Sequence, residues 1–345
     1  MSNLSSGDAV LKVEGLVTSF RTDDGTVTAL DGVGFDIGRG KTLGIVGESG
    51  CGKSVTSLSI MGLLPSGVGR IDAGKILFEG KNLATLPEEE MRDIRGNKIA
   101  MIFQEPMTAL NPVFTAGEQI IEVFMTHRNM DRSAARKAAL AMMEMVKIPD
   151  PERRLDEYPH QMSGGMKQRV MIAMALACKP AVIIADEPTT ALDVTIQSQI
   201  LRLMQDLQKE TGTSIMFITH DLGVIAEMAD DVVVMYAGQV IERADVVTLF
   251  DHPLHPYTKG LLASIPHVGQ HRDKKLSTIR GSVPSLMNLP AGCRFYGRCP
   301  YRQPECEKTR PALESFKGAH EVACLFAGRI DAGEIKPNYE ALGGE

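Results

Sequence analysis

The chain has 345 residues, of which 43% are hydrophobic, so it is long enough for one large domain or two modest ones with a substantial core. Its formal net charge of −6 argues against a broad electrostatic attraction to nucleic acid. No stretch approaches the ~18 consecutive apolar residues of a membrane-spanning helix, and residues 1–7 lack the basic and apolar pattern of a signal peptide. These features predict a cytosolic protein that reaches a membrane only through partner chains.

The N-terminal part of the sequence predicts mainly strands. We expect, in order, strands at 10–20, 27–37 and 42–46, a helix at 55–64, a strand at 75–78, a helix at 87–95 and a strand at 98–103. A polar turn at 21–25 joins the first two strands.

The pattern changes to helices from residue 115. Thr115 and Glu118 have the Thr-x-x-Glu spacing of a capping box, which marks the start of a helix. Residues 133–145 and 164–178 carry apolar side chains at helical spacing. We therefore expect an inserted α-helical subdomain at about residues 115–178.

Strands and helices then alternate up to residue 242. The expected elements are a strand at 182–185, a helix at 195–210, a strand at 214–218, a helix at 221–228 and strands at 231–236 and 239–242. Such alternation predicts an α/β fold with a largely parallel sheet covered on both faces. After residue 251 the pattern fades into prolines, turns and cysteines, so we expect one domain at 8–251 and a C-terminal extension at 252–345.

A glycine-rich sequence lies between the expected strand at 42–46 and the helix at 55–64. It consists of Gly47, Glu48, Ser49, Gly50, Cys51, Gly52, Lys53 and Ser54, followed by Val55. Glycines let backbone N–H groups close on phosphate oxygens, and the helix N-terminus adds partial positive charge. In such a loop Lys53 reaches the β- and γ-phosphates of a nucleotide, and the Ser54 hydroxyl ligates Mg²⁺. The sequence therefore predicts a nucleoside triphosphate site.

The apolar strand at 182–185 ends in two acidic residues. Asp186 is expected beside the phosphate loop, where its carboxylate can hold Mg²⁺ through water. Glu187 can then orient or deprotonate the attacking water. Two solvated acids at an ordinary strand end are the alternative, and the glycine-rich loop favours the catalytic interpretation.

Ser163, Gly164 and Gly165 open the expected helix at 164–178. A serine and two glycines at a helix start form an anion-binding nest. Serine is also a common N-cap without any ligand. From this segment alone both interpretations stay open.

Six motifs occur in one order along the chain: the loop at 47–54, Gln104 after a strand, Ser163-Gly164-Gly165, residues 182–187, Ala191-Leu192-Asp193, and His220. In this order they resemble the nucleotide-binding subunit of an ABC transporter, over about residues 8–250. The resemblance implies a P-loop NTPase (RecA-like) core with an antiparallel β subdomain and an inserted helical signature subdomain. It also implies ATP hydrolysis with Mg²⁺.

The resemblance implies roles for single residues. The signature motif, Ser163 to Met166, contacts the γ-phosphate bound to the opposite subunit, and Asp193 lies at the dimer seam. Phe20 stacks on adenine, although a core position suits it nearly as well. The implied catalytic residues are Lys53, Gln104, Glu187 and His220, and the implied Mg²⁺ ligands are Ser54, Gln104 and Asp186. Gln104 would also couple to the membrane partner.

Three longer stretches, 47–55, 103–112 and 186–195, resemble the ATPases of dipeptide and oligopeptide permeases, above all the D-type subunit of a dipeptide permease. Residues 252–258 resemble the C-terminal extension of that group. This resemblance implies a related F-type ATPase partner, two membrane permease subunits and an extracytoplasmic peptide-binding protein, but no nucleic acid. It implies a peripheral location on the cytoplasmic face of the inner (plasma) membrane.

Several alternatives remain for the function. Importers of nickel, glutathione, microcin or some sugars share these features, so the substrate stays open, as does the choice between a hetero- and a homodimer of ATPase chains. A soluble ABC ATPase outside transport is a further alternative. It is disfavoured by the single set of motifs and the lack of a sustained heptad run.

Four cysteines, Cys293, Cys299, Cys306 and Cys324, crowd the C-terminal extension. Four thiolates can hold zinc or an iron–sulfur cluster. The close Cys-x-x-Cys pairs of zinc ribbons are missing, and Pro300 follows Cys299 as in some ferredoxins. The permease resemblance also implies a 4Fe–4S cluster here. We expect such a cluster in a structural role, with zinc or unligated buried thiols as the alternatives.

Overall fold

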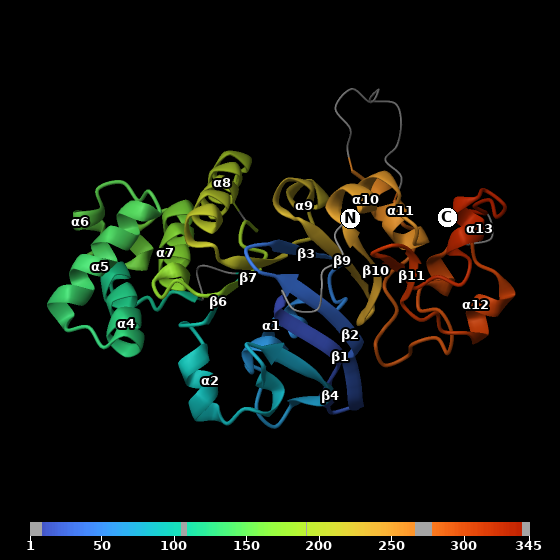
Figure 1. Ribbon diagram of the computed structural model, residues 1–345, viewed down its shortest axis with the longest axis horizontal. Helices are drawn as coiled ribbons and strands as arrows, with labels where there is room; N and C mark the ends of the chain where they lie inside the picture. Colours follow the sequence, from blue (N-terminus) through green and yellow to red (C-terminus); the bar gives the residue numbers. More distant parts are fainter. Residues whose placement is uncertain (1–8, 105–108, 191, 266–277, 340–345) are drawn as a thin grey trace.

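The computed structural model describes residues 9–104, 109–190, 192–265 and 278–339. The two sheets lie in the middle of the molecule, between a group of helices at one end and the C-terminal extension at the other (Figure 1). Some residues of the expected motifs lie outside the described ranges, namely Glu105, Pro106, Met107 and Ala191. The outer ends of the two expected domains, residue 8 and residues 340–345, also lie outside them.

The small sheet is antiparallel. Its strands are β1 (Ala9–Thr22), β2 (Gly25–Gly38), β4 (Gly69–Phe78) and β5 (Lys81–Asn82), in the order β2-β1-β4-β5. The strands expected at 10–20 and 27–37 are confirmed as a hairpin, and the strand expected at 75–78 begins earlier, at Gly69. A single 3₁₀ turn (Leu83–Thr85) and α2 (Glu88–Ile94) follow.

The large sheet has the order β11-β12-β10-β9-β3-β8-β7-β6. Its strands are β3 (Thr42–Val46), β6 (Ile99–Ile102), β7 (Val182–Asp186), β8 (Ser214–Ile218), β9 (Asp231–Tyr236), β10 (Gln239–Asp245), β11 (Glu314–Lys317) and β12 (His320–Val322). The five strands from β6 to β9 are parallel to one another, and β10 and β12 continue the sheet in antiparallel pairs. The expected parallel sheet is confirmed.

Both faces of the large sheet are buried, which explains the continuous apolar runs in its strands. On one face, Leu43 and Ile45 of β3 share a core with the small sheet and with α1 (Lys53–Met61). On the other face, Val46 packs with helices that include α8 (Val194–Thr211), α9 (Leu222–Met228) and α10 (Val246–Asp251). The sheet therefore holds the ends of its parallel strands in fixed positions.

The helical group comprises α4 (Ala116–Arg128), α5 (Arg132–Met145), α6 (Pro151–Arg154) and α7 (Gly164–Leu176), and it lies at one end of the molecule (Figure 1). The predicted capping box is present, since Glu118 N–H donates to Thr115 Oγ1 at 3.2 Å and Thr115 N–H donates to Glu118 Oε2 at 3.1 Å. The inserted helices expected in this part of the chain are thus observed. Among the described residues, no helix combines the length and hydropathy needed to cross a membrane.

The C-terminal extension is joined to the large sheet. It contains α11 (Pro256–Ala263), a 3₁₀ turn at Tyr296–Arg298, α12 (Pro304–Lys308) and α13 (Ala327–Asp331), and its strand β12 pairs with β10. The carboxylate of Glu242 on β10 is fully buried and accepts hydrogen bonds from Leu254 N–H at 2.6 Å and His255 N–H at 2.9 Å. His320 Nε2 lies 2.8 Å from the same carboxylate. Strand β10, residues 254–255 and strand β12 therefore meet at the buried carboxylate of Glu242.

Candidate functional site

The glycine-rich loop connects β3 to α1, and its glycines take backbone conformations that other residues rarely adopt. Gly47 and Gly52 have φ angles of 153° and 105°. A Cβ at Gly47 would lie 2.3 Å from the Met235 carbonyl oxygen on β9, and a Cβ at Gly52 would lie 2.6 Å from Leu30 Cδ2. The loop fits against the neighbouring strands only because these positions are glycine.

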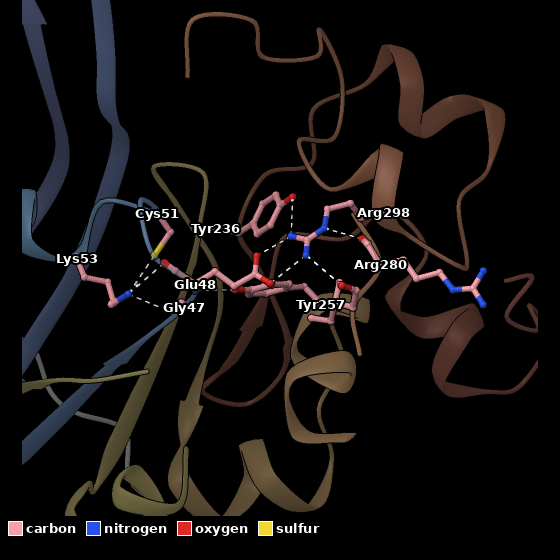
Figure 2. Close-up of polar contacts among 9 residues, drawn as sticks. Gly47, Glu48, Cys51, Lys53, Tyr236, Tyr257, Arg280 and Arg298 are labelled. Atoms are coloured by element: carbon pink, nitrogen blue, oxygen red, sulfur yellow. Dashed lines mark hydrogen bonds and ion pairs between the residues drawn. The ribbon is translucent and has the colours of Figure 1, made fainter. Parts of the chain in front are cut away.

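Lys53 begins α1, and its ammonium group turns back over the loop (Figure 2). Nζ donates to the carbonyl oxygens of Gly47 at 2.7 Å and Glu48 at 3.1 Å, and it lies 3.9 Å from Cys51 Sγ. The Cys51 side chain is buried, and this burial raises the pKa of its thiol. A single positive charge is therefore held inside the curve of the loop. Ser49, Gly50 and Ser54 are exposed, whereas Val55 is half-buried.

Asp186 is the last residue of β7 and is nearly fully buried. Burial raises the pKa of its carboxyl group, and a hydrogen bond with the Ser54 side chain acts in the opposite direction. Its Oδ1 atom is buried and has no hydrogen-bond partner among the described residues. The structure thus places two of the expected Mg²⁺ ligands, Ser54 and Asp186, in direct contact.

Glu187 is the centre of a cluster formed by three neighbouring strand ends. Its Oε2 accepts hydrogen bonds from Thr190 Oγ1 at 2.8 Å and Gln104 Nε2 at 3.2 Å, and it lies 3.3 Å from His220 Nδ1. Gln104, Glu187 and His220 follow β6, β7 and β8, which are adjacent and parallel, so their ends share one edge of the sheet. The structure therefore brings together three of the four expected catalytic residues.

Thr190 is a site residue to which the sequence analysis assigned no role. Its side chain makes the shortest of the contacts to Glu187 Oε2, and its backbone N–H donates to the Glu187 carbonyl oxygen at 3.1 Å. Glu187 itself has a positive φ of 47°. In the sequence, a threonine three residues after an acidic residue in a turn would have indicated this side-chain hydrogen bond.

The signature residues 163–166 and Asp193 lie at the starts of two helices, where their polar contacts are helix caps. Ser163 caps α7 by accepting the N–H of Met166 at 3.3 Å, and Asp193 caps α8 by accepting the N–H of Ile196 at 2.9 Å. A Cβ at Gly165 would lie 2.8 Å from Ile196 Cγ2, so the glycine allows the start of α7 to approach α8 closely. The N-cap interpretation of Ser163 is confirmed, and an anion-binding role for residues 163–166 stays a prediction.

Phe20 lies on β1 in the small sheet and is half-buried. Its ring packs over Gly69 of β4, where a Cβ would lie 2.9 Å from Phe20 Cε1. This packing accounts for an aromatic residue at this position, and stacking on adenine stays a prediction.

The expectation of a 4Fe–4S cluster in the C-terminal extension is wrong. The four cysteines Cys293, Cys299, Cys306 and Cys324 are free thiols around one small cavity. Across the described ranges, however, no three His, Cys, Asp or Glu side chains are grouped so that they could hold a metal ion. Burial raises the pKa of Cys293 and of Cys324 to about 11. The zinc alternative has no support either, because zinc would need the same grouping of ligands, which the described residues do not show.

Two protein-family models match the chain, one in its N-terminal part and one in its C-terminal part. The family described as "ABC transporter" matches residues 30–190, which include the glycine-rich loop and Glu187. The family described as "Oligopeptide/dipeptide transporter, C-terminal region" matches residues 241–306.

Several curated proteins resemble the chain over nearly its whole length. A probable peptide ABC transporter ATP-binding protein, y4tR, from Sinorhizobium fredii is 52% identical over 96% of this chain and 98% of its own. The dipeptide transport ATP-binding protein DppD from Bacillus subtilis is 52% identical over 92% of this chain and 94% of its own. The oligopeptide transport ATP-binding protein AppD from the same organism is 54% identical over 92% and 96%.

Solved structures resemble the larger part of the chain. The ATP-binding cassette MJ0796, in a dimeric post-hydrolysis state bound to ADP and Pi, superimposes with a TM-score of 0.62 at 29% identity, over 68% of this chain and 98% of its own. The cassette cbiO1 of Clostridium perfringens, part of the transporter complex cbiONQ, gives a TM-score of 0.60 at 31% identity, over 71% and 92%. Both similarities confirm the expected P-loop NTPase fold.

Proposed function

Because the chain belongs to the ATP-binding subunits of oligopeptide and dipeptide ABC transporters, we propose that it hydrolyses ATP to drive a peptide importer. The observation that carries this function is the convergence of Gln104, Thr190 and His220 on the carboxylate of Glu187. This cluster lies at the end of the same parallel sheet whose strand β3 leads into the glycine-rich loop. The arrangement suits the attack of a water molecule on a terminal phosphate.

The loop at 47–54 binds the triphosphate of ATP. Its backbone N–H groups and the N-terminus of α1 contact the phosphate oxygens. Lys53 exchanges the neutral carbonyl oxygens of Gly47 and Glu48 for phosphate oxygens, because an ammonium group forms its stronger hydrogen bonds with charged acceptors. Phe20 stacks on the adenine ring.

Ser54, Asp186 and Gln104 would hold the Mg²⁺ that accompanies the nucleotide. Hard cations prefer oxygen ligands, and these side chains offer a hydroxyl, a carboxylate and an amide oxygen. The buried Oδ1 of Asp186, which has no hydrogen-bond partner among the described residues, fits a cation in this position. When bound, Mg²⁺ neutralises negative charge on the β- and γ-phosphates.

Glu187 acts as the general base. Thr190, Gln104 and His220 all contact Oε2, so together they fix the plane of the carboxylate and the direction of Oε1. A carboxylate in a fixed orientation can accept a proton from a water placed in line with the γ-phosphate. His220, whose side chain is 65% exposed, is placed to contact the γ-phosphate from the same edge of the sheet.

Residues Ser163 to Met166 and Asp193 act across the interface with a second ATPase chain. Within this chain, Ser163 and Asp193 cap α7 and α8 and make no contact with the Glu187 cluster that the structure describes. We therefore propose that they face the nucleotide bound to the opposite subunit. The partners are a related F-type ATPase, two membrane permease subunits and an extracytoplasmic peptide-binding protein. The chain then works on the cytoplasmic face of the membrane.

Residues 8–251 form the ATPase domain in this proposal, with the helical subdomain at about 115–178, and residues 252–345 form the extension. The two family matches, at 30–190 and 241–306, support this division. The peptide substrate is supported by the names of the relatives, which refer to peptide, dipeptide and oligopeptide transport.

The proposal is tested by reconstituting the full chain with its permease subunits and binding protein in proteoliposomes. ATP-dependent uptake of a labelled dipeptide is expected with the wild type, and Lys53→Ala should abolish it. Lys209→Ala, on the exposed face of α8, is the matched control and should transport normally. Unchanged uptake by Lys53→Ala would contradict the ATPase role. Uptake of nickel, glutathione or a sugar but of no peptide would contradict the substrate.

A further inference from the structure

Glu48, the second residue of the glycine-rich loop, is held by the C-terminal extension at both its backbone and its side chain (Figure 2). Its backbone N–H donates to the hydroxyl of Tyr257 on α11 at 2.8 Å. Its carboxylate accepts two hydrogen bonds from the Arg298 guanidinium, at 2.6 Å and 2.9 Å. Its carbonyl oxygen accepts the 3.1 Å hydrogen bond from Lys53 Nζ. One residue thus links the extension directly to the phosphate-binding lysine.

The ion pair between Arg298 and Glu48 is enclosed. The Arg298 side chain is 8% exposed and that of Glu48 is 29% exposed. Arg298 Nε also donates to the carbonyl oxygen of Arg280 at 2.9 Å, which fixes the plane of the guanidinium. A paired, two-point contact of this kind orients both partners, whereas a lysine would supply a single point charge.

The residues behind this contact form a rigid support. The rings of Tyr236 and Tyr257 have centroids 4.8 Å apart, and Phe295 packs against both at 5.3 Å and 5.5 Å. Tyr236 belongs to β9 of the large sheet, whereas Tyr257 and Phe295 belong to the extension. The aromatic cluster therefore fixes the extension to β9, so that Tyr257 and Arg298 are held in place beside the loop.

We propose that Arg298 is a positioning residue for the phosphate loop, so that the C-terminal extension sets the affinity for ATP. The inference rests on the ATPase function proposed above. Arg298 acts through Glu48: it holds the first turn of the loop in the curve that directs the backbone N–H groups and Lys53 toward one point. Because these groups bind the phosphates before the chemical step, loosening the loop raises KM more than it lowers kcat.

The first test compares Arg298→Met with the wild type in the full chain, assembled with its permease subunits. The substitution keeps the apolar stem of the side chain and removes the guanidinium, with its two hydrogen bonds to Glu48 and its hydrogen bond to the Arg280 carbonyl oxygen. KM for MgATP should rise about fivefold or more, with kcat within about twofold of the wild type. Arg298→Lys should restore part of the affinity. Arg329→Met is the matched control, because Arg329 lies in the same extension and its ion pair with Glu334 is exposed on both sides.

A double-mutant cycle separates positioning from a general effect on folding. In a Glu48→Ala background, Arg298→Met should add little to the rise in KM, since alanine leaves Arg298 no acceptor at this position and the two residues act through one contact. If Arg298→Met does not fold, Tyr257→Phe carries the test, because it keeps the ring and removes only the acceptor of Glu48 N–H. It should raise KM while leaving kcat unchanged.

The outcomes distinguish this inference from the proposed function. Wild-type ATP hydrolysis together with an unchanged KM in Arg298→Met and Tyr257→Phe would overturn the positioning role and leave the ATPase function intact. A fall in kcat with unchanged KM would also overturn it. The absence of ATP hydrolysis in the wild-type complex would overturn both.

Discussion

Glu187 Oε2 and His220 Nδ1 lie 3.3 Å apart, at the ends of the adjacent parallel strands β7 and β8. Their environments differ, since the His220 side chain is 65% exposed and that of Glu187 only 14%. The Glu187 carboxylate is therefore held in place by the protein, whereas the His220 ring is accessible from outside the chain. This difference suits the roles proposed for them, a general base at Glu187 and a contact to the γ-phosphate at His220.

Thr190 is expected to contribute to catalysis through the orientation of Glu187. Thr190→Val removes the 2.8 Å hydrogen bond and keeps the shape of the side chain. A hydrogen bond to a charged group is worth about 1.5–3 kcal/mol, so kcat should fall about tenfold or more while KM for ATP stays unchanged. Steady-state kinetics of the transporter complex provide the measurement. Thr26→Val, at the exposed start of β2, is the control, and equal kcat values for both variants would contradict the assigned role.

Gly47 is expected to tolerate no side chain. A Cβ there would lie 2.3 Å from the Met235 carbonyl oxygen, and the φ of 153° is unfavourable for other residues. Gly47→Ala should lower the free energy of unfolding by about 1–3 kcal/mol and weaken ATP binding at least tenfold, measured by denaturant unfolding and nucleotide titration. Gly34→Ala, whose Cβ would lie 3.5 Å from its nearest neighbour, should behave like the wild type. Normal ATP binding by Gly47→Ala would show that the loop is not held against β9.

His255 is expected to make stability depend on pH. The ring is fully buried, Nδ1 accepts the N–H of Tyr257 at 3.0 Å, and burial lowers the pKa to about 4, against an opposing effect of Glu242. The unfolded chain therefore binds the proton more tightly than the folded chain. The stabilising contribution is complete above about pH 6.5 and is lost as the pH falls toward 4, by up to about 3 kcal/mol.

The measurement is the free energy of unfolding between pH 4 and 7, for the wild type and for His255→Asn, whose amide oxygen can accept the Tyr257 N–H. The substituted protein should show a flatter pH profile, because it lacks the titrating group. Parallel profiles for the two proteins would contradict a buried neutral His255.

Glu242 is expected to hold the extension on the large sheet. Glu242→Ala leaves the buried N–H groups of Leu254 and His255 without their acceptor, at a cost of about 1–3 kcal/mol for each. The variant should melt at a lower temperature, and limited proteolysis should cut the extension first. Glu314→Ala, on the exposed strand β11, should match the wild type. Equal protease resistance of both variants would argue against this anchoring role.

The sequence predicted the parts of the site that depend on local order along the chain. The glycine-rich loop and Glu187 were predicted from the buried strands that precede them. Gln104 and His220 were identified by the family resemblance, and each also follows a strand of the parallel sheet, so all three side chains come to one edge. The continuous apolar runs identified those strands because both faces of the sheet are covered.

The sequence did not predict the contacts between distant segments. Arg298 and Glu48 are 250 positions apart, and the pairing of β12 with β10 involves a strand of only three residues, too short for a clear periodic pattern. The cysteine prediction was wrong for a related reason. Spacing indicates which thiols are near one another in sequence, but whether they are grouped as metal ligands depends on the folded chain, and the described residues show no such grouping.

The most direct test of the ATPase mechanism is the turnover of Glu187→Gln in the assembled transporter, measured together with its affinity for ATP. Glutamine keeps the size and polar contacts of the side chain but is not a base. We expect kcat to fall about 10²–10⁴-fold, with an affinity for ATP within about twofold of the wild type. Hydrolysis at the wild-type rate would contradict it, because the cluster around Glu187 would then not be the catalytic centre.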